Sequence, residues 1–311
     1  MFVSIIVCTH SLDNYQNLID LIDSLLNQTH KGIEINIIVD GNQELYERIM
    51  KVYEAQDEIR VVAIAENVGL CGARNEGIKR ARGDAIAFLD DDAVAERRWV
   101  ENLVRTYEEL DAVAVGGKIL PIWLCERPDY LPEELDWLVG ITHEGFAEEK
   151  VAEVRNTFGP NMSFKREVFN KVGLFNENLG FGGRGTSYIQ AEEAELSLRV
   201  KGQLGKGVIY NPEVIVYHKI PPSKVKVDVL LKRAFYQGYS KALLRSLNPS
   251  HEPLATEKSY LNDLLFKYIP RRIKRFLRAS HCAVETKKLS LLVASILSVG
   301  LGFVYGYVKR M

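Results

Sequence analysis

Short apolar runs alternate with amphipathic stretches along the first 117 residues of the chain. The run Phe2–Cys8 is apolar at all but one position, which is typical of a strand buried on both faces of a parallel sheet. The stretches between the runs place apolar residues three or four positions apart, as amphipathic helices do. The pattern predicts an α/β fold with helices on both faces of a mostly parallel sheet. The expected strands are Phe2–Cys8, Ile33–Val39, Ile59–Ala65, Ala85–Leu89 and Ala112–Gly116, and the expected helices are Tyr15–Leu26, Gln43–Ala55, Gly72–Ala81 and Arg98–Leu110.

The alternation ends near residue 117, and the rest of the chain divides into three further segments. Residues 118–248 begin with a loop-rich stretch, broken by prolines and glycines, and end in a long helical pattern over Val225–Leu247. Loops carried by a rigid sheet commonly hold binding residues. Residues 249–288 form a basic segment, and residues 289–308 form an uncharged one.

The uncharged segment Leu289–Val308 is long enough to cross a bilayer as a helix. A buried helix of a soluble protein and a helix lying flat on lipid are the alternatives. Within the segment, Gly302 and Gly306 form a small-residue face through which a second copy could pack as a homodimer. Six basic residues and no acidic one lie between Leu264 and Val284, and basic residues beside a span favour the cytoplasmic side. We therefore expect a single-pass protein of the cell membrane with its preceding domain in the cytoplasm.

Composition narrows the class of partner only slightly. The formal net charge of −1 gives no sign of a nucleic-acid partner, and we expect none. The four cysteines lie far apart, without the spacing of a disulfide framework or a zinc site.

Three carboxylates, Asp90, Asp91 and Asp92, directly follow the expected strand Ala85–Leu89. Crowded carboxylates repel one another unless a cation, hydrogen bonds or solvent compensate them. Mg²⁺ and Mn²⁺ prefer oxygen ligands and keep positions open for phosphates, so a divalent metal is the leading candidate. The alternative is an acidic cap on the helix that follows.

Polar residues also end the other expected strands: Thr9 and His10, Asp40 and Gly41, and Glu66 and Asn67. Ligands of parallel sheets bind at the carboxyl ends of the strands, so these side chains are expected along one edge. No Gly-x-Gly-x-x-Gly follows the first strand, which argues against a dinucleotide site.

Four motifs stand in a specific order: Asp40 after a strand, Asn67-x-Gly69 with Ala73-Arg74-Asn75, Gly83-Asp84 with Phe88–Asp92, and Glu192-Glu193-Ala194-Glu195-Leu196. Over residues 2 to about 240 the chain resembles the inverting glycosyltransferases of family 2, which have the Rossmann-like GT-A fold. It also resembles relatives that act on dolichyl- or polyprenyl-phosphate-linked sugars. The resemblance implies a nucleotide-sugar-binding half in residues 1–117 and an acceptor-binding half with the catalytic base in residues 118–248.

The resemblance implies roles for the strand-end residues. Thr9 and Asp40 would hold the nucleotide base, Arg74 would approach the base or a phosphate, and Asp90 the ribose. Asp92 would bind the metal that bridges the two phosphates. Asn67 and Asp91 are placed in the nucleotide-sugar site with them. Asp40 capping a turn, and Arg74 pairing on a helix face, are the structural alternatives.

Glu192 and Glu193 match the family's Glu-Asp pair, whose second carboxylate is the general base that deprotonates the acceptor hydroxyl. The chain departs from the family at Glu193, where aspartate is usual, but glutamate offers the same chemistry one methylene further out. Glu193 is therefore the predicted base, with Glu192 as the second candidate. The alternative is a solvated helix face with ordinary ion pairs to Arg199.

Three further residues take roles from the resemblance. His218, which ends an apolar run, would be a metal ligand, and the alternative is a histidine satisfied within the core. Asn161, in the loop Phe158–Phe164, would lie on the acceptor side unless that loop is only a structural turn. Arg233 would meet the phosphate of a lipid-linked acceptor.

The sequence therefore predicts transfer of a sugar, with inversion, from a nucleotide-sugar donor to a hydroxyl of a lipid-linked or glycan acceptor. A UDP-sugar is the predicted donor, Mg²⁺ or Mn²⁺ the cofactor, and assembly of an N-glycan or a surface polysaccharide the setting. A non-catalytic nucleotide-sugar-binding scaffold subunit is the rival. A nucleotidyltransferase or phosphatase would need a phosphate-gripping loop or a nucleophilic aspartate after the first strand, where Cys8-Thr9-His10-Ser11 stands instead.

Overall fold

The computed structural model describes residues 1–181, 188–247, 254–278 and 282–309. The chain forms two compact units. Unit 1 comprises Met1–Leu120, Glu149–Tyr188 and Glu192–Lys219, and unit 2 comprises Pro121–Glu148, Ile189–Ala191 and Ile220–Met311.

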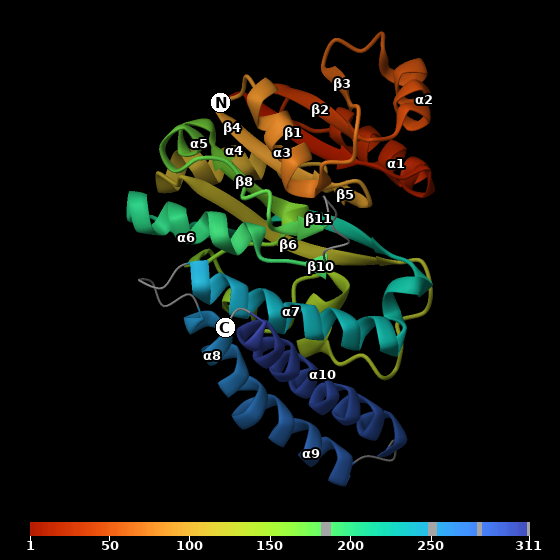
Figure 1. Ribbon diagram of the computed structural model, residues 1–311, viewed down its shortest axis with the longest axis vertical. Coiled ribbons are helices and arrows are strands. Elements are labelled where there is room, and N and C mark those ends of the chain that lie inside the picture. The colour runs from red at the N-terminus through yellow and green to blue at the C-terminus, as the bar shows by residue number, and fades with distance from the viewer. Residues whose placement is uncertain (182–187, 248–253, 279–281, 310–311) are drawn as a thin grey trace. The chain divides into compact units, whose positions relative to one another are not determined.

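A mixed sheet forms the centre of unit 1 (Figure 1). Four strands, β1 (Val3–Thr9), β2 (Ile33–Asp40), β3 (Ile59–Ile64) and β4 (Ala85–Asp90), pair in parallel in the order β3-β2-β1-β4. The sheet continues through β8, β6, β11 and β5, and β8 is antiparallel to both of its neighbours. The predicted α/β fold is confirmed, with its parallel part in the first four strands. The remaining strands are β5 (Ala93–Ala95), β6 (Ala114–Trp123), β7 (Ala152–Val154), which pairs with β11, β8 (Met162–Lys165) and β11 (Val208–Ile220), and a separate pair, β9 (Gly180–Phe181) and β10 (Tyr188–Ile189).

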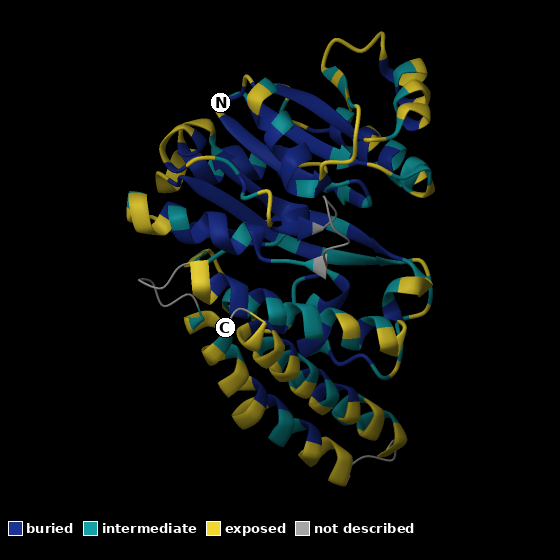
Figure 2. Ribbon diagram, viewed as in Figure 1, coloured by how far each residue is buried: buried dark blue, intermediate teal, exposed yellow. Residues whose placement is uncertain are grey.

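Strands β1, β2 and β4 are buried on both faces because helices cover both faces of the sheet there (Figure 2). Val3, Ile5 and Val7 join one buried cluster with side chains of α1, α2 and α4. On the opposite face Ile6 meets α3 so closely that a Cβ on Gly77 would lie 2.6 Å from its Cγ2. The helices and helical turns of this unit are η1 (Leu12–Asn14), α1 (Tyr15–Leu26), α2 (Gln43–Tyr53), α3 (Gly69–Arg80), α4 (Trp99–Leu110), η4 (Gly159–Asn161), α5 (Arg166–Val172) and α6 (Glu192–Leu204).

Unit 2 is mainly helical, and its longest helix is apolar. In the part of the chain that the structure describes, α10 is the one helix long and apolar enough to cross a membrane, judged by length and composition. A single pass through a membrane stays a prediction from the sequence. The helices and turns of this unit are η2 (Glu133–Val139), η5 (Pro222–Val225), α7 (Val227–Leu247), α8 (Ala255–Asp263), the π-helical turn η6 (Leu264–Tyr268), α9 (Ile269–Arg278) and α10 (Cys282–Val308). The turn η3 (Phe146–Glu149) contains the point in the sequence where unit 2 ends and unit 1 resumes.

The small-residue face of α10 packs against α7 of the same chain. A Cβ on Gly302 would lie 1.9 Å from the carbonyl oxygen of Phe235, and one on Gly306 would lie 3.0 Å from the Cβ of Ala242. Both glycines are buried there. The prediction of a homodimer through Gly302 and Gly306 is therefore corrected, because α7 already occupies this face.

Replacing Gly302 by alanine is expected to lower the free energy of unfolding by about 2 kcal/mol or more, because the added methyl has no room against the α7 backbone. Gly300 is the matched control, since a Cβ there meets nothing within 4 Å. Gly300→Ala is expected to stabilise α10 by roughly 0.5–1 kcal/mol through its higher helix propensity. Thermal unfolding followed by circular dichroism in detergent measures both, and equal effects of the two changes would contradict the packing described.

Candidate active site

Asp91 ties the end of β4 to the end of β1. Its Oδ2 accepts a hydrogen bond from the hydroxyl of Thr9 at 2.6 Å, and its Oδ1 accepts one from the side-chain amide of Asn14 at 2.9 Å. Burial raises the pKa of Asp91 to about 7, against the effect of the Thr9 hydrogen bond. The two predicted nucleotide-site residues Thr9 and Asp91 therefore contact each other, and their roles toward a nucleotide stay predictions.

Asp90, Asp92 and His218 gather beside this strand end. One ligand atom from each lies within 4.8 Å of the other two. The Nε2 of His218 lies 3.1 Å from the Oδ1 of Asp92, and β11 brings the histidine there by pairing with Ala93 of β5. Two carboxylate oxygens and one imidazole nitrogen form a donor set that suits Mn²⁺ and is less typical of Mg²⁺, which prefers oxygen alone. The residues present therefore fit a divalent transition metal.

Arg74 connects this cluster to the start of α6. Its guanidinium is buried and lies 3.4 Å from an oxygen of Asp90 and 3.2 Å from an oxygen of Glu192. The guanidinium also lies over the ring of Phe175, 5.6 Å from its centroid. A buried arginine is stable only with such partners. The structure thus brings together three predicted site residues that are far apart in the sequence.

Glu193 lies next to this arginine at the first turn of α6. Its Oε1 accepts a hydrogen bond from the backbone N–H of Gly159 at 3.0 Å. A Cβ on Gly159 would lie 2.9 Å from this same oxygen and 2.9 Å from the Nη2 of Arg74, so only glycine fits here without a shift. Desolvation, together with the charge of Glu192, raises the pKa of Glu193 to about 7. Glu193 is therefore a carboxylate that can take up and release a proton near neutral pH.

Asp40 closes the turn that precedes α3. Its two carboxylate oxygens accept hydrogen bonds from the backbone N–H groups of Val68 and Gly69, at 2.8 and 2.9 Å. Burial raises the pKa of Asp40, although both hydrogen bonds oppose the shift. Asn67 is exposed beside this turn. Asp40 thus caps the turn at the start of α3, as the structural alternative expected. Contact of Asp40 and Asn67 with a nucleotide stays a prediction.

The two predicted acceptor-side residues lie in different units. Asn161 is fully buried in unit 1, where its oxygen accepts from the indole N–H of Trp99 at 3.0 Å and its amide donates to the carbonyls of Lys118 and Val214. Arg233 lies on α7 in unit 2 and donates to the carbonyl of Leu138 at 2.6 Å. Both have structural contacts, and their roles toward an acceptor stay predictions.

Two residues outside the predicted set shape the site. Asn75 holds Phe175 in place under Arg74, since its amide donates to the carbonyl of Phe175 and accepts from the N–H of Phe175, both at 3.0 Å. Gly159 supplies the N–H that fixes Glu193. Asn75 directly follows Arg74 in the Ala73-Arg74-Asn75 motif, and this position could have indicated from the sequence that Asn75 belongs to the site. Gly159 carries no signal of its own beyond the Gly-Pro-Asn turn.

The chain resembles known glycosyltransferases in sequence. The model of the glycosyl transferase family 2 matches residues 4–173. The chain is 39% identical over 307 residues to a glucosyl-dolichyl phosphate glucuronosyltransferase of Haloferax volcanii, covering 98% of this chain and 96% of that protein. It is 32% identical over 259 residues to EpsJ, an uncharacterized glycosyltransferase of Bacillus subtilis, covering 77% of this chain and 71% of that protein.

Solved structures share its fold at low sequence identity. The mannosyltransferase PcManGT from Pyrobaculum calidifontis, in complex with GDP-Man and Mn²⁺, superposes with a TM-score of 0.64 at 14% identity, covering 97% of this chain and 87% of that one. S. aureus TarS in complex with UDP-GlcNAc superposes with a TM-score of 0.55 at 16% identity, covering 99% of this chain and 89% of that one.

The sheet, its flanking helices and these neighbours define the GT-A fold. Because the family model covers more than half of its length, the chain belongs to glycosyl transferase family 2.

Proposed function

We propose that this enzyme transfers a sugar from a nucleotide-sugar, most simply a UDP-sugar, to a hydroxyl of a lipid-linked sugar, with inversion at the anomeric carbon. One observation carries the proposal. Arg74 bridges Asp90, a member of the candidate metal site, and Glu192, the neighbour of Glu193, whose pKa is raised to about 7. Donor-binding and proton-accepting groups are thus neighbours within unit 1.

Glu193 acts in this proposal as the general base, and Glu192 keeps Arg74 in position. A sugar hydroxyl attacks the anomeric carbon from the face opposite the leaving nucleoside diphosphate, and it must lose its proton as the new bond forms. A carboxylate with a pKa near 7 is ionised in about half of the molecules at neutral pH, and the ionised form can accept that proton. The N–H of Gly159 fixes the direction of the carboxylate.

Asp92 and His218, with Asp90, would hold a divalent metal beside the diphosphate. When bound, such a metal neutralises the charge that grows on the departing diphosphate. The PcManGT structure contains Mn²⁺ together with GDP-Man, and the mixed oxygen and nitrogen donors of this chain favour the same ion. In the same proposal Thr9, Asp40, Asn67 and Asp91 border the nucleoside, and Asn161 and Arg233 belong to the acceptor side.

A relative that matches nearly the full chain supports the proposed class of acceptor. The Haloferax volcanii protein is named for transfer of a glucuronosyl group to glucosyl-dolichyl phosphate, and the similarity covers nearly all of both chains. We therefore propose a dolichyl-phosphate-linked sugar as acceptor, and assembly of an N-glycan or a surface polysaccharide at the cytoplasmic face of the cell membrane as the setting.

A transfer assay with the full chain in detergent tests the proposal. Radiolabelled UDP-glucuronic acid, UDP-glucose and UDP-N-acetylglucosamine would each be offered with Mn²⁺ to glucosyl-dolichyl phosphate and to dolichyl phosphate. We expect one donor to label the sugar-bearing lipid only, with an inverted anomeric configuration by NMR. Nucleotide binding without transfer to either lipid would favour the scaffold alternative, and a retained configuration would exclude the base mechanism.

The rate of transfer is expected to depend on pH through Glu193. Since its pKa is raised to about 7, the base is protonated and inactive at lower pH, and it becomes available as the pH rises. We expect kcat/KM to fall by about tenfold for each pH unit below 7 and to level off above it. Initial rates between pH 5.5 and 8.5 measure this, with donor binding at each pH as the control. A flat profile would rule out a base of this pKa.

A further inference from the structure

The carboxyl-terminal half of α10 is fastened to α7 along its length. The hydroxyl of Ser298 donates to the carbonyl of Leu231 at 2.8 Å, and a Cβ on Gly238 would lie 1.9 Å from the carbonyl oxygen of Val299. Together with Gly302 against Phe235, these contacts place the backbones of the two helices in direct contact. Any position that α10 takes in a membrane therefore applies to α7 as well.

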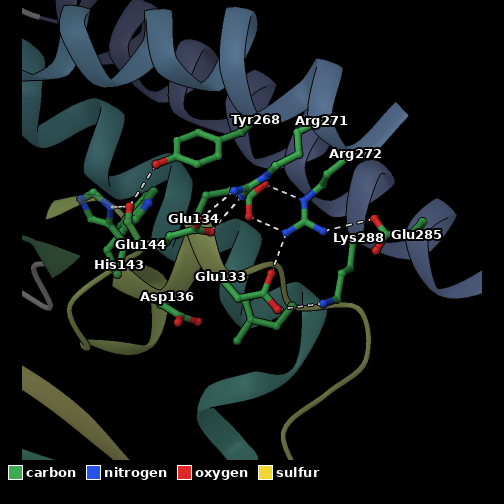
Figure 3. A network of polar contacts seen from close by, with 12 residues as sticks. Glu133, Glu134, Asp136, His143, Glu144, Tyr268, Arg271, Arg272, Glu285 and Lys288 are labelled. Atoms are coloured by element: carbon green, nitrogen blue, oxygen red, sulfur yellow. Dashed lines mark hydrogen bonds and ion pairs between the residues drawn. The ribbon is translucent and has the colours of Figure 1, made fainter. Parts of the chain in front are cut away.

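The amino-terminal end of α10 is held by ion pairs (Figure 3). Lys288 lies 2.9 Å from Glu133, and Glu285 lies 3.2 Å from Arg272 of α9. Arg272 is completely buried, and it pairs with the equally buried Glu134 at 2.5 Å. Separating α10 from this network would take Glu285 away from the buried Arg272 and Lys288 away from Glu133, which is unfavourable.

Helix α7, which packs against α10, carries charged side chains that are costly to place in the hydrocarbon core of a bilayer. Arg233 of α7 donates to the carbonyl of Leu138, and Lys241 of α7 lies 2.8 Å from Glu257 of α8. Charged side chains at the centre of a bilayer are costly and rare. With α7 fastened to it, α10 is poorly suited to stand across the membrane.

Many residues of these helices are exposed (yellow in Figure 2), and several of the exposed side chains are apolar. On η6 and α9, Phe266 is 79% exposed and Leu277 is 74% exposed, and Ile273 lies between them on the same helical face. Lys267 and Lys274 directly follow Phe266 and Ile273, so positive charge borders the apolar stripe. A second stripe of exposed side chains runs along α10 at Val293, Leu297, Leu301, Val304 and Val308.

We infer that unit 2 binds the surface of an anionic bilayer through these two stripes, with α10 lying in the plane of the interface instead of crossing it. An apolar face bordered by lysines is the pattern of a helix that inserts shallowly among headgroups and attracts anionic lipids. This arrangement differs from the single pass that the sequence predicts. It is independent of the identity of the donor and of the base, so either proposal can fail without the other.

Labelling of the carboxyl-terminal end separates the two arrangements. Lys309→Cys and Lys51→Cys, each in a Cys282→Ser background, would be reconstituted with sealed vesicles and treated with a membrane-impermeant maleimide, with Cys282→Ser alone as the blank. Both lysines are exposed, and Lys51 reports the side on which unit 1 lies. We expect equal labelled fractions of the two variants before detergent is added. Complementary fractions, in which Lys309→Cys is labelled to the extent that Lys51→Cys is protected, would show a crossing helix and overturn the inference.

Flotation with vesicles tests the lipid surface itself. We expect the full chain to bind vesicles of phosphatidylcholine with one quarter phosphatidylglycerol, and to bind pure phosphatidylcholine at least about tenfold more weakly. Phe266→Ser with Leu277→Ser is expected to weaken binding by about tenfold or more, since two apolar side chains no longer enter the interface. The control pair, Val52→Ser with Leu110→Ser, changes exposed apolar residues of unit 1 and should have no effect. Equal losses for both pairs, or none for either, would contradict the proposed surface.

Discussion

Glu193→Gln is expected to lower the rate of sugar transfer by about a thousandfold while the affinity for the nucleotide stays within a factor of about three. Glutamine is isosteric with glutamate, and its amide oxygen can still accept the hydrogen bond from Gly159. It cannot accept the proton of the acceptor hydroxyl. Initial rates of transfer, with calorimetric titration of the nucleotide, measure the two quantities separately.

A matched control for this change is Glu195→Gln on the same helix. Glu195 pairs with Arg199 at 2.8 Å and has no proposed part in the chemistry, so this variant should keep nearly full activity. Glu193→Asp, which introduces the residue usual in the family, is expected to retain measurable transfer. Robust transfer by Glu193→Gln would remove Glu193 as the base and direct attention to Glu192.

Asp92→Asn is expected to weaken Mn²⁺-dependent binding of the donor by at least about a hundredfold, because loss of a direct ligand should exceed the 10–100-fold cost of losing an outer partner. The change removes one negative charge from the group formed with Asp90 and His218 and alters little else in shape. Titration of the nucleotide with Mn²⁺ and again with EDTA measures the effect, and EDTA should abolish binding to the unchanged protein.

Asp111→Asn is the control for the loss of a carboxylate in unit 1. Asp111 is exposed, and in the described part of the chain its ion pairs are with Lys165 and Lys206. It should bind donor and metal like the unchanged chain. If Asp92→Asn retained metal-dependent binding, the metal would have to be held elsewhere or the site would not use one.

Local patterns were sufficient for the parallel part of the fold. Strands β1, β2 and β4 are buried on both faces, so their apolar runs stand out in the sequence. The carboxylates at the end of β4 directly follow one of these runs. The start of α6 at Glu192 likewise coincides with an acidic pair that suits a helix amino terminus.

Contacts between distant segments could not be predicted in the same way. The pair of Arg74 with Glu192 joins residues 118 positions apart, and no periodicity records it. Asn161 resembles an ordinary turn residue in the sequence, but the structure buries it completely among three partners. The glycines of α10 suggest a close helix contact without specifying the partner, which proved to be α7.

The buried pair of Arg272 and Glu134 has a practical consequence for protein engineering. Removing the apolar tail to obtain a more soluble fragment, for example by ending the chain at residue 247, would delete Arg272 and Tyr260, which pair with the side chain and the carbonyl of Glu134. A residue that is completely buried in the intact chain would then lose its partners and its cover together. The same cut would uncover the α7 backbone at Gly238. Solubility is therefore better sought by substituting the outward-facing residues of α10 than by truncation.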